Sequence, residues 1–172
     1  MSMKRILIVV FVLVLLLLVL SRFDVFPKQM SEEEKRAAAY VESRGYHIEE
    51  RLGKTFTYIL DKSLLNSESA ASTGNLPYIQ TWGVQESDPG DYFGKEIATY
   101  GFTVSGHPLS EHYNTDTRVA IMMADGEVIG GTSIPKPGLV GSPYSLDGRT
   151  LEEITGISFA EWKEQWAQKY NE

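Results

Sequence analysis

The chain has 172 residues, of which 42% are hydrophobic, a formal net charge of −7 and no cysteine. This length suits one domain with a complete core, and the composition is not that of a disordered, collagen-like or disulfide-stabilised protein. The lack of cysteine excludes thiol catalysis, disulfides, cysteine-ligated zinc and the lipidated cysteine of a bacterial lipoprotein.

The charge distribution argues against a nucleic-acid partner. Three of the 16 basic residues and one of the 23 acidic residues precede Lys28, so the rest of the chain carries a net charge of −9. An acidic domain has no field that attracts phosphate backbones, and the sequence contains no run of Lys and Arg interleaved with aromatic residues. We therefore predict no binding of nucleic acid.

A continuous apolar segment near the start of the chain predicts contact with a membrane. Fifteen apolar residues, Ile6 to Leu20, follow Lys4 and Arg5, which is the order found in export signals and signal-anchors. As a helix these residues are about 22 Å long. The hydrocarbon core of a bilayer is roughly 30 Å thick, and basic side chains that reach the interface lengthen the span that the helix can cover. Residues 1–27 are predicted to form a cytoplasmic tail, a transmembrane signal-anchor and a juxtamembrane connector.

Two outcomes remain open for this segment. The run ends in Leu20-Ser21-Arg22-Phe23, which lacks a cleavage motif of the Ala-x-Ala kind, so a retained anchor is favoured. The predicted location is then the cell membrane, crossed once, with the lipid bilayer as partner through Ile6 to Leu20 and the C-terminal domain extracytoplasmic. Cleavage would instead release a secreted form of the same domain.

Residues 28–134 are predicted to form one α+β domain. Ser31 precedes three glutamates and Gly45 supplies a left-handed stop, so a helix is expected between them. Alternating apolar residues predict strands, and two β-rich runs joined by Asp125-Gly126 predict a hairpin. The polar stretch Asn66 to Asn75 is expected to be a loop. The expected elements are a helix over 32–44, strands over 46–52, 56–60 and 98–104, a short helix over 76–85, and hairpin strands over 118–124 and 127–134.

Residues 135–172 are predicted to form a Pro/Gly-rich loop followed by C-terminal helices. Thr150 and Ser158 each precede a glutamate by three residues, which is the capping-box spacing, and the last helix is expected from Phe159 to about Tyr170. The whole chain is then an N-terminal membrane helix followed by an antiparallel sheet of about five strands, with helices covering one sheet face.

Several motifs between Arg36 and about Ser133 carry a family resemblance. They are Tyr46 after the first helix, Asp88-x-x-x-Tyr92-x-Gly94-Lys95, Tyr100-x-Phe102-x-Val104, and RVAIMMADGEVIGG from Arg118 to Gly131. In these the chain resembles the family known as domain of unknown function 4830, found chiefly in Gram-positive Firmicutes behind an N-terminal hydrophobic segment. The resemblance implies an envelope protein, but no activity, ligand or catalytic residue.

This chain departs from the family pattern at two places. Thr132 and Ser133 follow the glycine pair where the family tends to have an aspartate and a cysteine, and Gly106-His107-Pro108 stands at an Asn-Tyr-Pro-like site. A function carried by those family positions is not expected in this chain.

Three groups of residues are candidate sites. His107, Glu111 and His112 are the ligand types of an open zinc site, but their spacing is that of a solvated loop. Asp88 and Asp91 are suited to calcium or a shared proton, yet beside Pro89-Gly90 they are typical of a turn. Gly130-Gly131 lacks the lysine and helix start of a phosphate loop and indicates a bulge or close packing. We therefore assign no catalytic, cofactor-binding or metal residue.

The terminal helix carries an aromatic stripe of Phe159, Trp162, Trp166 and Tyr170. Such a stripe normally packs on the domain itself, whereas an exposed Trp162/Trp166 face would suit an envelope protein partner. The sequence thus favours a membrane-anchored, extracytoplasmic, non-enzymatic binding or interaction module. The alternative is an envelope hydrolase or metal-dependent enzyme using His107, Glu111 and His112.

Overall fold

The computed structural model describes residues 29–68, 74–137 and 141–171. The predicted transmembrane segment lies outside these residues, and none of the described helices is long and apolar enough to span a bilayer. The residues from Ser31 onward belong to one compact unit, which includes the predicted C-terminal segment 135–172.

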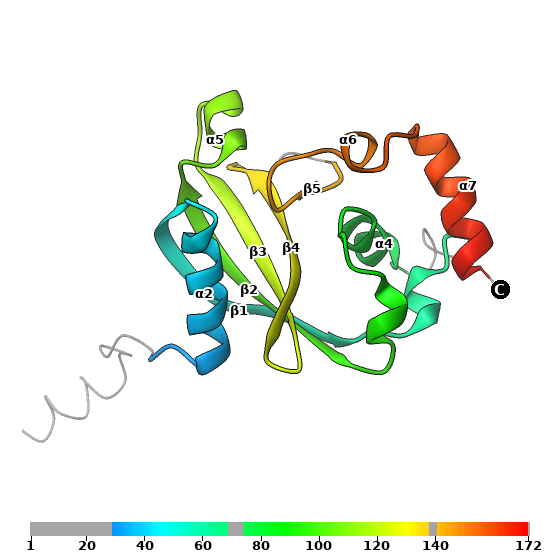
Figure 1. Ribbon diagram of the computed structural model, residues 1–172, viewed down its shortest axis with the longest axis horizontal. Helices are drawn as coiled ribbons and strands as arrows, with labels where there is room; N and C mark the ends of the chain where they lie inside the picture. Colours follow the sequence, from blue (N-terminus) through cyan, green and yellow to red (C-terminus); the bar gives the residue numbers. More distant parts are fainter. Residues whose placement is uncertain (1–28, 69–73, 138–140, 172) are drawn as a thin grey trace, which may run out of the picture. The chain divides into compact units, whose positions relative to one another are not determined.

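This unit is an α+β fold around a five-stranded antiparallel sheet, as the sequence predicts (Figure 1). The strands are β1 (His47–Ile59), β2 (Glu96–Ser105), β3 (Thr117–Ala124), β4 (Glu127–Pro135) and β5 (Tyr144–Ser145). The helices are α2 (Glu32–Ser43), α4 (Leu76–Gly83), α5 (Pro108–Tyr113), α6 (Leu151–Thr155) and α7 (Phe159–Tyr170), with 3-10 turns η1 (Lys62–Leu65) and η2 (Pro89–Tyr92). The strands lie in the order β1-β2-β3-β4-β5, so each pairs with its neighbour in sequence.

Local capping signals place most of the helix ends. Ser31 Oγ accepts a hydrogen bond from the Glu34 amide, and Gly45 lies just past α2 with a φ of 85°. Thr150 and Ser158 each form a complete capping box at the start of α6 and α7. These side chains satisfy amides that have no partner within their own helix, which confirms the predicted helix starts.

The β3–β4 hairpin is confirmed at its predicted turn. Asp125 and Gly126 both have positive φ, 51° and 77°, as a two-residue turn of type I′ requires. The ladder shifts register beside Met122, where Gly130 and Val128 pair with successive β3 residues and Ile129 is left as the extra residue. The bulge predicted near the glycine pair is therefore present.

The glycine pair also lets a side chain approach the edge of β4. Gln85 accepts a hydrogen bond from the Gly131 amide at 2.8 Å and donates one to the Gly131 carbonyl at 3.1 Å. A Cβ on Gly130 would lie 2.2 Å from Gln85 Oε1, and one on Gly131 would lie 2.7 Å from the Ala120 carbonyl oxygen. Gln85 thus takes the place of a neighbouring strand at this edge, and a side chain at position 130 would collide with it.

Three sequence predictions need correction. The strands expected over 46–52 and 56–60 are one strand, β1, because three register irregularities absorb its interruptions. The Gly106-His107-Pro108 segment does not continue as loop but starts helix α5, with Pro108 in its first turn. The irregular segment after Pro135 contains β5, which pairs with Thr132 and Ser133 of β4.

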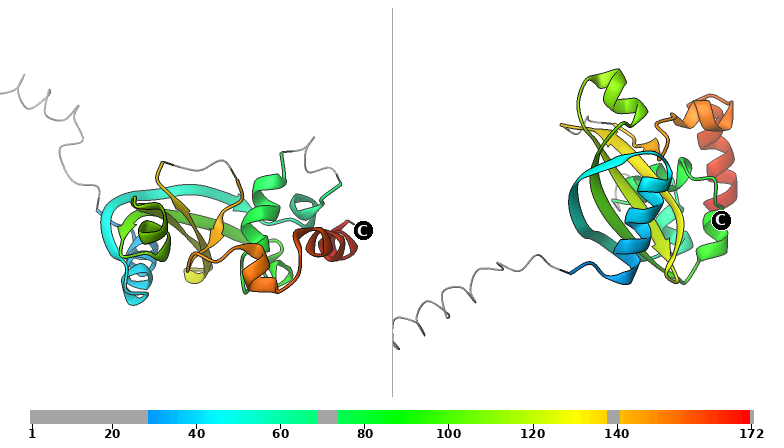
Figure 2. Two further views of the ribbon diagram at one scale, coloured as in Figure 1. Left: turned by 90° about the horizontal axis from the view of Figure 1, so that it is seen from above. Right: turned by 60° about the vertical axis from the view of Figure 1, so that its left-hand side comes forward.

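Helices lie against both faces of the sheet, not one as predicted. On β2 and β3 the residues Tyr100, Phe102, Val119 and Ile121 share the face that α2 covers with Ala37 and Val41. The side chains of Ile97 and Met122 lie on the opposite face of the sheet, where they belong to a second cluster with α4. Figures 1 and 2 show α2 near one end of the sheet and α4 with α7 near the other.

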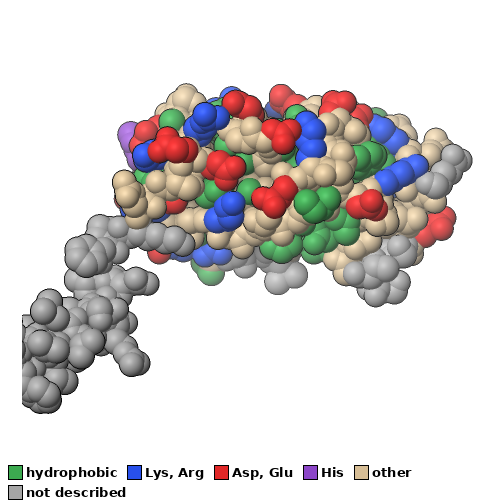
Figure 3. Space-filling model, turned by 90° about the horizontal axis from the view of Figure 1, so that it is seen from below, with side chains coloured by type: hydrophobic (Ala, Val, Ile, Leu, Met, Phe, Trp, Pro, Cys, Tyr) green, Lys and Arg blue, Asp and Glu red, His purple; other side chains and the backbone are tan. Residues whose placement is uncertain are grey.

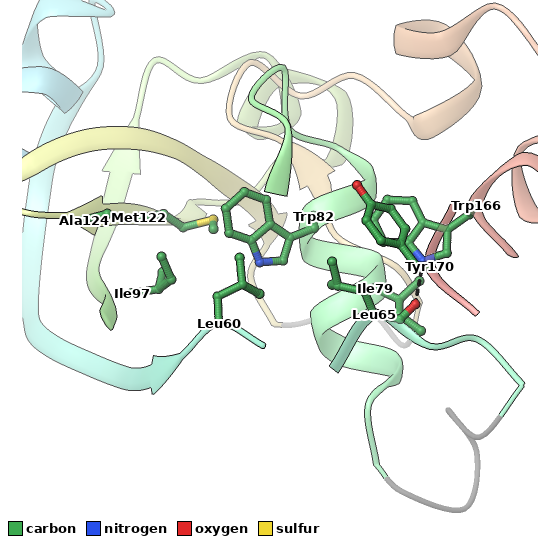
Figure 4. Packing of buried hydrophobic residues seen from close by; sticks show 9 residues of the cluster. All are labelled: Leu60, Leu65, Ile79, Trp82, Ile97, Met122, Ala124, Trp166 and Tyr170. Atoms are coloured by element: carbon green, nitrogen blue, oxygen red, sulfur yellow. Dashed lines mark hydrogen bonds between the residues drawn. The ribbon is translucent and has the colours of Figure 1, made fainter. Parts of the chain in front are cut away.

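The second cluster joins the C-terminal helix to the sheet (Figure 4). Trp82 of α4 is 2% exposed, and its Nε1 donates to the Tyr58 hydroxyl at 2.9 Å. Trp166 of α7 donates from Nε1 to the Leu65 carbonyl oxygen at 2.8 Å. The buried members of the cluster are Leu60, Leu65, Ile79, Trp82, Ile97, Met122, Ala124, Trp166 and Tyr170.

Candidate functional site

An apolar groove of about 400 Å³ lies between helix α4 and the sheet face that α2 leaves uncovered. Strands β1 to β4 form its floor, because each strand contributes at least one lining residue whose side chain is on this face of the sheet. Its volume falls in the range of small-molecule sites. The lining residues are Phe56, Tyr58, Gly74, Pro77, Tyr78, Thr81, Thr99, Ala120, Met122 and Thr132.

Three aromatic rings form one wall of this groove. The Tyr58 and Tyr78 ring centroids are 4.9 Å apart with an edge-on arrangement, and the Phe56 ring lies 5.6 Å from Tyr58 and 6.2 Å from Tyr78. Phe56 is 52% exposed, which is high for a phenylalanine, so its ring stands at the mouth. Burial raises the pKa of Tyr58 to about 12, and this hydroxyl therefore stays neutral.

None of the described residues that line the groove has a charged side chain. Its polar atoms are neutral hydroxyls, from Thr81, Thr99, Thr132 and the two tyrosines. On the surface seen in Figure 3, by contrast, Lys/Arg and Asp/Glu side chains are interspersed, and the hydrophobic side chains gather toward one side. An ionised group placed in the groove would lose hydration without gaining a partner charge.

The structure does not bring His107, Glu111 and His112 together as metal ligands. Among the described residues no group of three or more His, Cys, Asp or Glu side chains is arranged to hold a metal ion. Glu111 and His112 are exposed on α5. The expectation that His107 belongs to a solvated loop is wrong, because this residue is fully buried.

Both ring nitrogens of His107 are occupied by the protein. Nδ1 accepts from the Leu109 amide at 3.1 Å and caps α5, while Nε2 lies 2.8 Å from the Leu146 carbonyl oxygen, to which it donates. Burial lowers the pKa of His107, so the ring is neutral. The Tyr46 ring packs against it at 4.6 Å. His107 thus connects α5 to the segment around β5 and has no nitrogen left for a metal.

Asp88 has a structural role as well. It caps η2 by accepting from the Gly90 amide, and it also accepts from Lys169 Nζ at 2.5 Å and from the Tyr170 hydroxyl at 3.2 Å. The hydrogen bond from Lys169, with that from Gly90, lowers the pKa of the Asp88 carboxyl group. Asp91 is exposed beside it. The turn interpretation accounts for both residues, and Asp88 additionally holds the end of α7.

The aromatic stripe packs mostly on the domain itself. Trp166 and Tyr170 are 8% and 4% exposed, Trp162 is partly buried, and only Phe159, at 54%, faces solvent. The Trp162/Trp166 face is therefore largely covered by the chain's own residues. The interpretation that the stripe packs on the domain accounts for Trp166 and Tyr170, and an envelope protein partner at the Trp162/Trp166 face stays a prediction.

A second, polar recess of about 240 Å³ lies beside the edge of β4 and includes Arg44, Glu86, Asp147 and Arg149. Burial disfavours ionisation of Asp147, but hydrogen bonds from Ser145 and Arg149 outweigh it and lower the pKa of this carboxyl. Arg149 Nε donates to Asp147 at 2.8 Å and its Nη2 donates to Glu86 at 3.4 Å. The charges of Asp147, Arg149 and Glu86 pair with one another, so this recess is a weaker candidate than the groove.

Comparisons with protein-family models, with curated proteins and with solved structures found no match for this chain. The resemblance to domain of unknown function 4830 therefore stays a prediction.

Sequence reasoning did not find the groove. The alternation of Phe56 and Tyr58 places both on one strand face, and the short helix over 76–85 was expected, but no local pattern shows that the helix crosses that face. No local signal marks Tyr78 either, because its place in the aromatic wall depends on packing against Tyr58 of β1.

Proposed function

We propose that the chain is a membrane-anchored, extracytoplasmic binding module whose groove accepts an uncharged apolar chain. The observation that carries this proposal is the combination in one groove of a wall of three aromatic rings, an uncharged lining and a volume of about 400 Å³. A concave, mostly apolar site with a few neutral polar groups is the usual form of a ligand pocket.

The proposed location of the protein agrees with this ligand class. An apolar segment of 15 residues at the N-terminus would hold the domain beside a bilayer, where alkyl and acyl chains are abundant. The net charge of −9 from Lys28 onward disfavours anionic headgroups, so the ligand recognised in the groove is the apolar chain and not a charged end. The hydroxyls of Tyr78 and Thr99, which line the groove, can form hydrogen bonds with a neutral polar group of the ligand.

Binding of an uncharged fluorescent probe, N-phenyl-1-naphthylamine, tests the ligand site. We expect the fragment 29–172 to bind this probe with enhanced fluorescence. The variant Ala120→Leu places extra carbons in the groove floor and should weaken probe binding by about tenfold or more, since filling a pocket removes the contact area of its ligand. The measurement is a fluorescence titration.

Ala160→Leu is the matched control, because it adds the same side chain at an exposed position of α7. It should leave the titration unchanged. Circular dichroism and a cooperative unfolding transition must first show that the fragment and both variants are folded. Equal probe affinity in the wild type and Ala120→Leu would place any apolar binding elsewhere.

The proposed topology has a separate test. Protease added to intact cells should cleave the chain at sites after Lys28, because the domain is expected outside the membrane. Cleavage would be followed with antibodies against the domain and a cytoplasmic protein as the integrity control. Complete protection in intact cells, with cleavage only after lysis, would contradict this topology.

A further inference from the structure

We propose that the C-terminal half of β1 pairs with the same segment of a second copy of this chain, in antiparallel register centred on Thr57. β1 is an edge strand, since β2 is its only strand neighbour among the described residues. An edge strand presents a row of backbone N–H and C=O groups that another strand can bind.

The backbone at Thr57 and Ile59 faces this open edge. Leu60 exchanges hydrogen bonds on the β2 side, donating to the Lys95 carbonyl at 3.0 Å and accepting from the Gly94 amide at 2.8 Å. Backbone groups alternate in direction along an antiparallel strand, so those of Tyr58 also point to β2. The N–H and C=O groups of Thr57 and Ile59 therefore point away from the sheet.

The two halves of β1 differ in how well this edge is protected. Charged residues and three register irregularities lie at or before Phe56, and such features prevent pairing with other chains. From Phe56 to Ile59 the register is regular, and the segment Thr55–Leu60 contains no charged residue. Phe56 and Ile59 are 52% and 54% exposed, on opposite faces of the strand. An added strand would cover both side chains.

The segment is complementary to itself. In antiparallel pairing centred on Thr57, residues opposite one another have numbers that sum to the same value, so Phe56 lies opposite Tyr58 of the second copy. Both side chains are on the groove face, and aromatic pairs across strands are stabilising.

Cysteine cross-linking of the full chain in liposomes tests this pairing directly, because the chain has no cysteine of its own. Opposed residues of this kind have Cα atoms about 5.5 Å apart, which is within the range for a disulfide. Under mild oxidation Thr57→Cys is expected to form a disulfide-linked dimer at least tenfold faster than Lys163→Cys, an exposed position on α7. Thr57 is itself exposed, so the substitution should not disturb folding.

Thr57→Cys should also self-link faster than Ile59→Cys, because the register centred on Thr57 keeps the two copies of position 59 apart. Equal rates for Thr57→Cys and Lys163→Cys would overturn the proposal, as would preferential self-linking of Ile59→Cys. Linking of Thr57→Cys to a different protein in cells, with no dimer, would show a foreign partner and would also overturn it. Ala120→Leu should leave dimer formation unchanged, so the result is independent of the proposed ligand.

Discussion

Replacement of Trp82 by alanine is expected to lower the free energy of unfolding by about 3–5 kcal/mol. The side chain is 2% exposed and belongs to the cluster that joins α4, α7 and the sheet (Figure 4). Its removal leaves a large cavity and takes away the indole N–H that donates to the Tyr58 hydroxyl. Since a domain is stable by only about 5–15 kcal/mol, the variant should be close to unfolding at physiological temperature.

Urea denaturation followed by circular dichroism measures this loss. Phe159→Ala is the control, because it also truncates an aromatic residue but at a position that is 54% exposed. We expect its midpoint to lie close to that of the wild type. A similar small change for Trp82→Ala would mean that the cluster around α4 does not hold the two ends of the fold together.

Trp82→Ala also has a consequence for the groove. Tyr58 forms part of the aromatic wall, and its hydroxyl is positioned by the Trp82 indole. The core of the second cluster and the proposed ligand site therefore share a side chain. Partial loss of probe binding is expected even under conditions where the variant remains folded.

Signals that act over a few residues predicted the fold best. Ser31, Thr150 and Ser158 cap the helices that follow them, and Asp125-Gly126 forms the hairpin turn. Each depends on hydrogen bonds or dihedral angles within about four residues, which the local sequence determines. The α+β class and the five antiparallel strands followed from these elements.

Features that depend on distant residues were the ones mispredicted. Gly53, with a φ of 70°, has the character of a residue that ends a strand. It nevertheless lies within β1, because the residues on both sides of it pair with β2. His107 resembles a loop residue because its hydrogen-bond acceptor, the Leu146 carbonyl, is 39 positions away. The groove likewise needs α4 and four strands. In each case tertiary contacts outweigh the local pattern.

The buried His107 should make the stability of the domain depend on pH. Its folded-state pKa is lowered by burial below the ordinary value of 6.5, whereas the unfolded chain takes up a proton near that value. The stabilisation is therefore fully present above pH 6.5. It is lost progressively as the pH falls toward the folded-state pKa, by at most about 1.4 kcal/mol per pH unit. Protonation would also place an N–H at Nδ1, which now accepts from the Leu109 amide.

His107→Gln distinguishes this effect from general acid denaturation, in which carboxylates such as Asp88 and Asp147 also take part. A neutral amide can donate to the Leu146 carbonyl and accept from the Leu109 amide, so the variant should lose the part of the pH dependence below about pH 6.5 that comes from this ring. His107→Ala leaves both groups without a partner and should cost about 1–3 kcal/mol for each group, at every pH. His112→Gln, at an exposed position, should retain the wild-type profile. Parallel profiles for the wild type and His107→Gln would show that the imidazole does not titrate on unfolding.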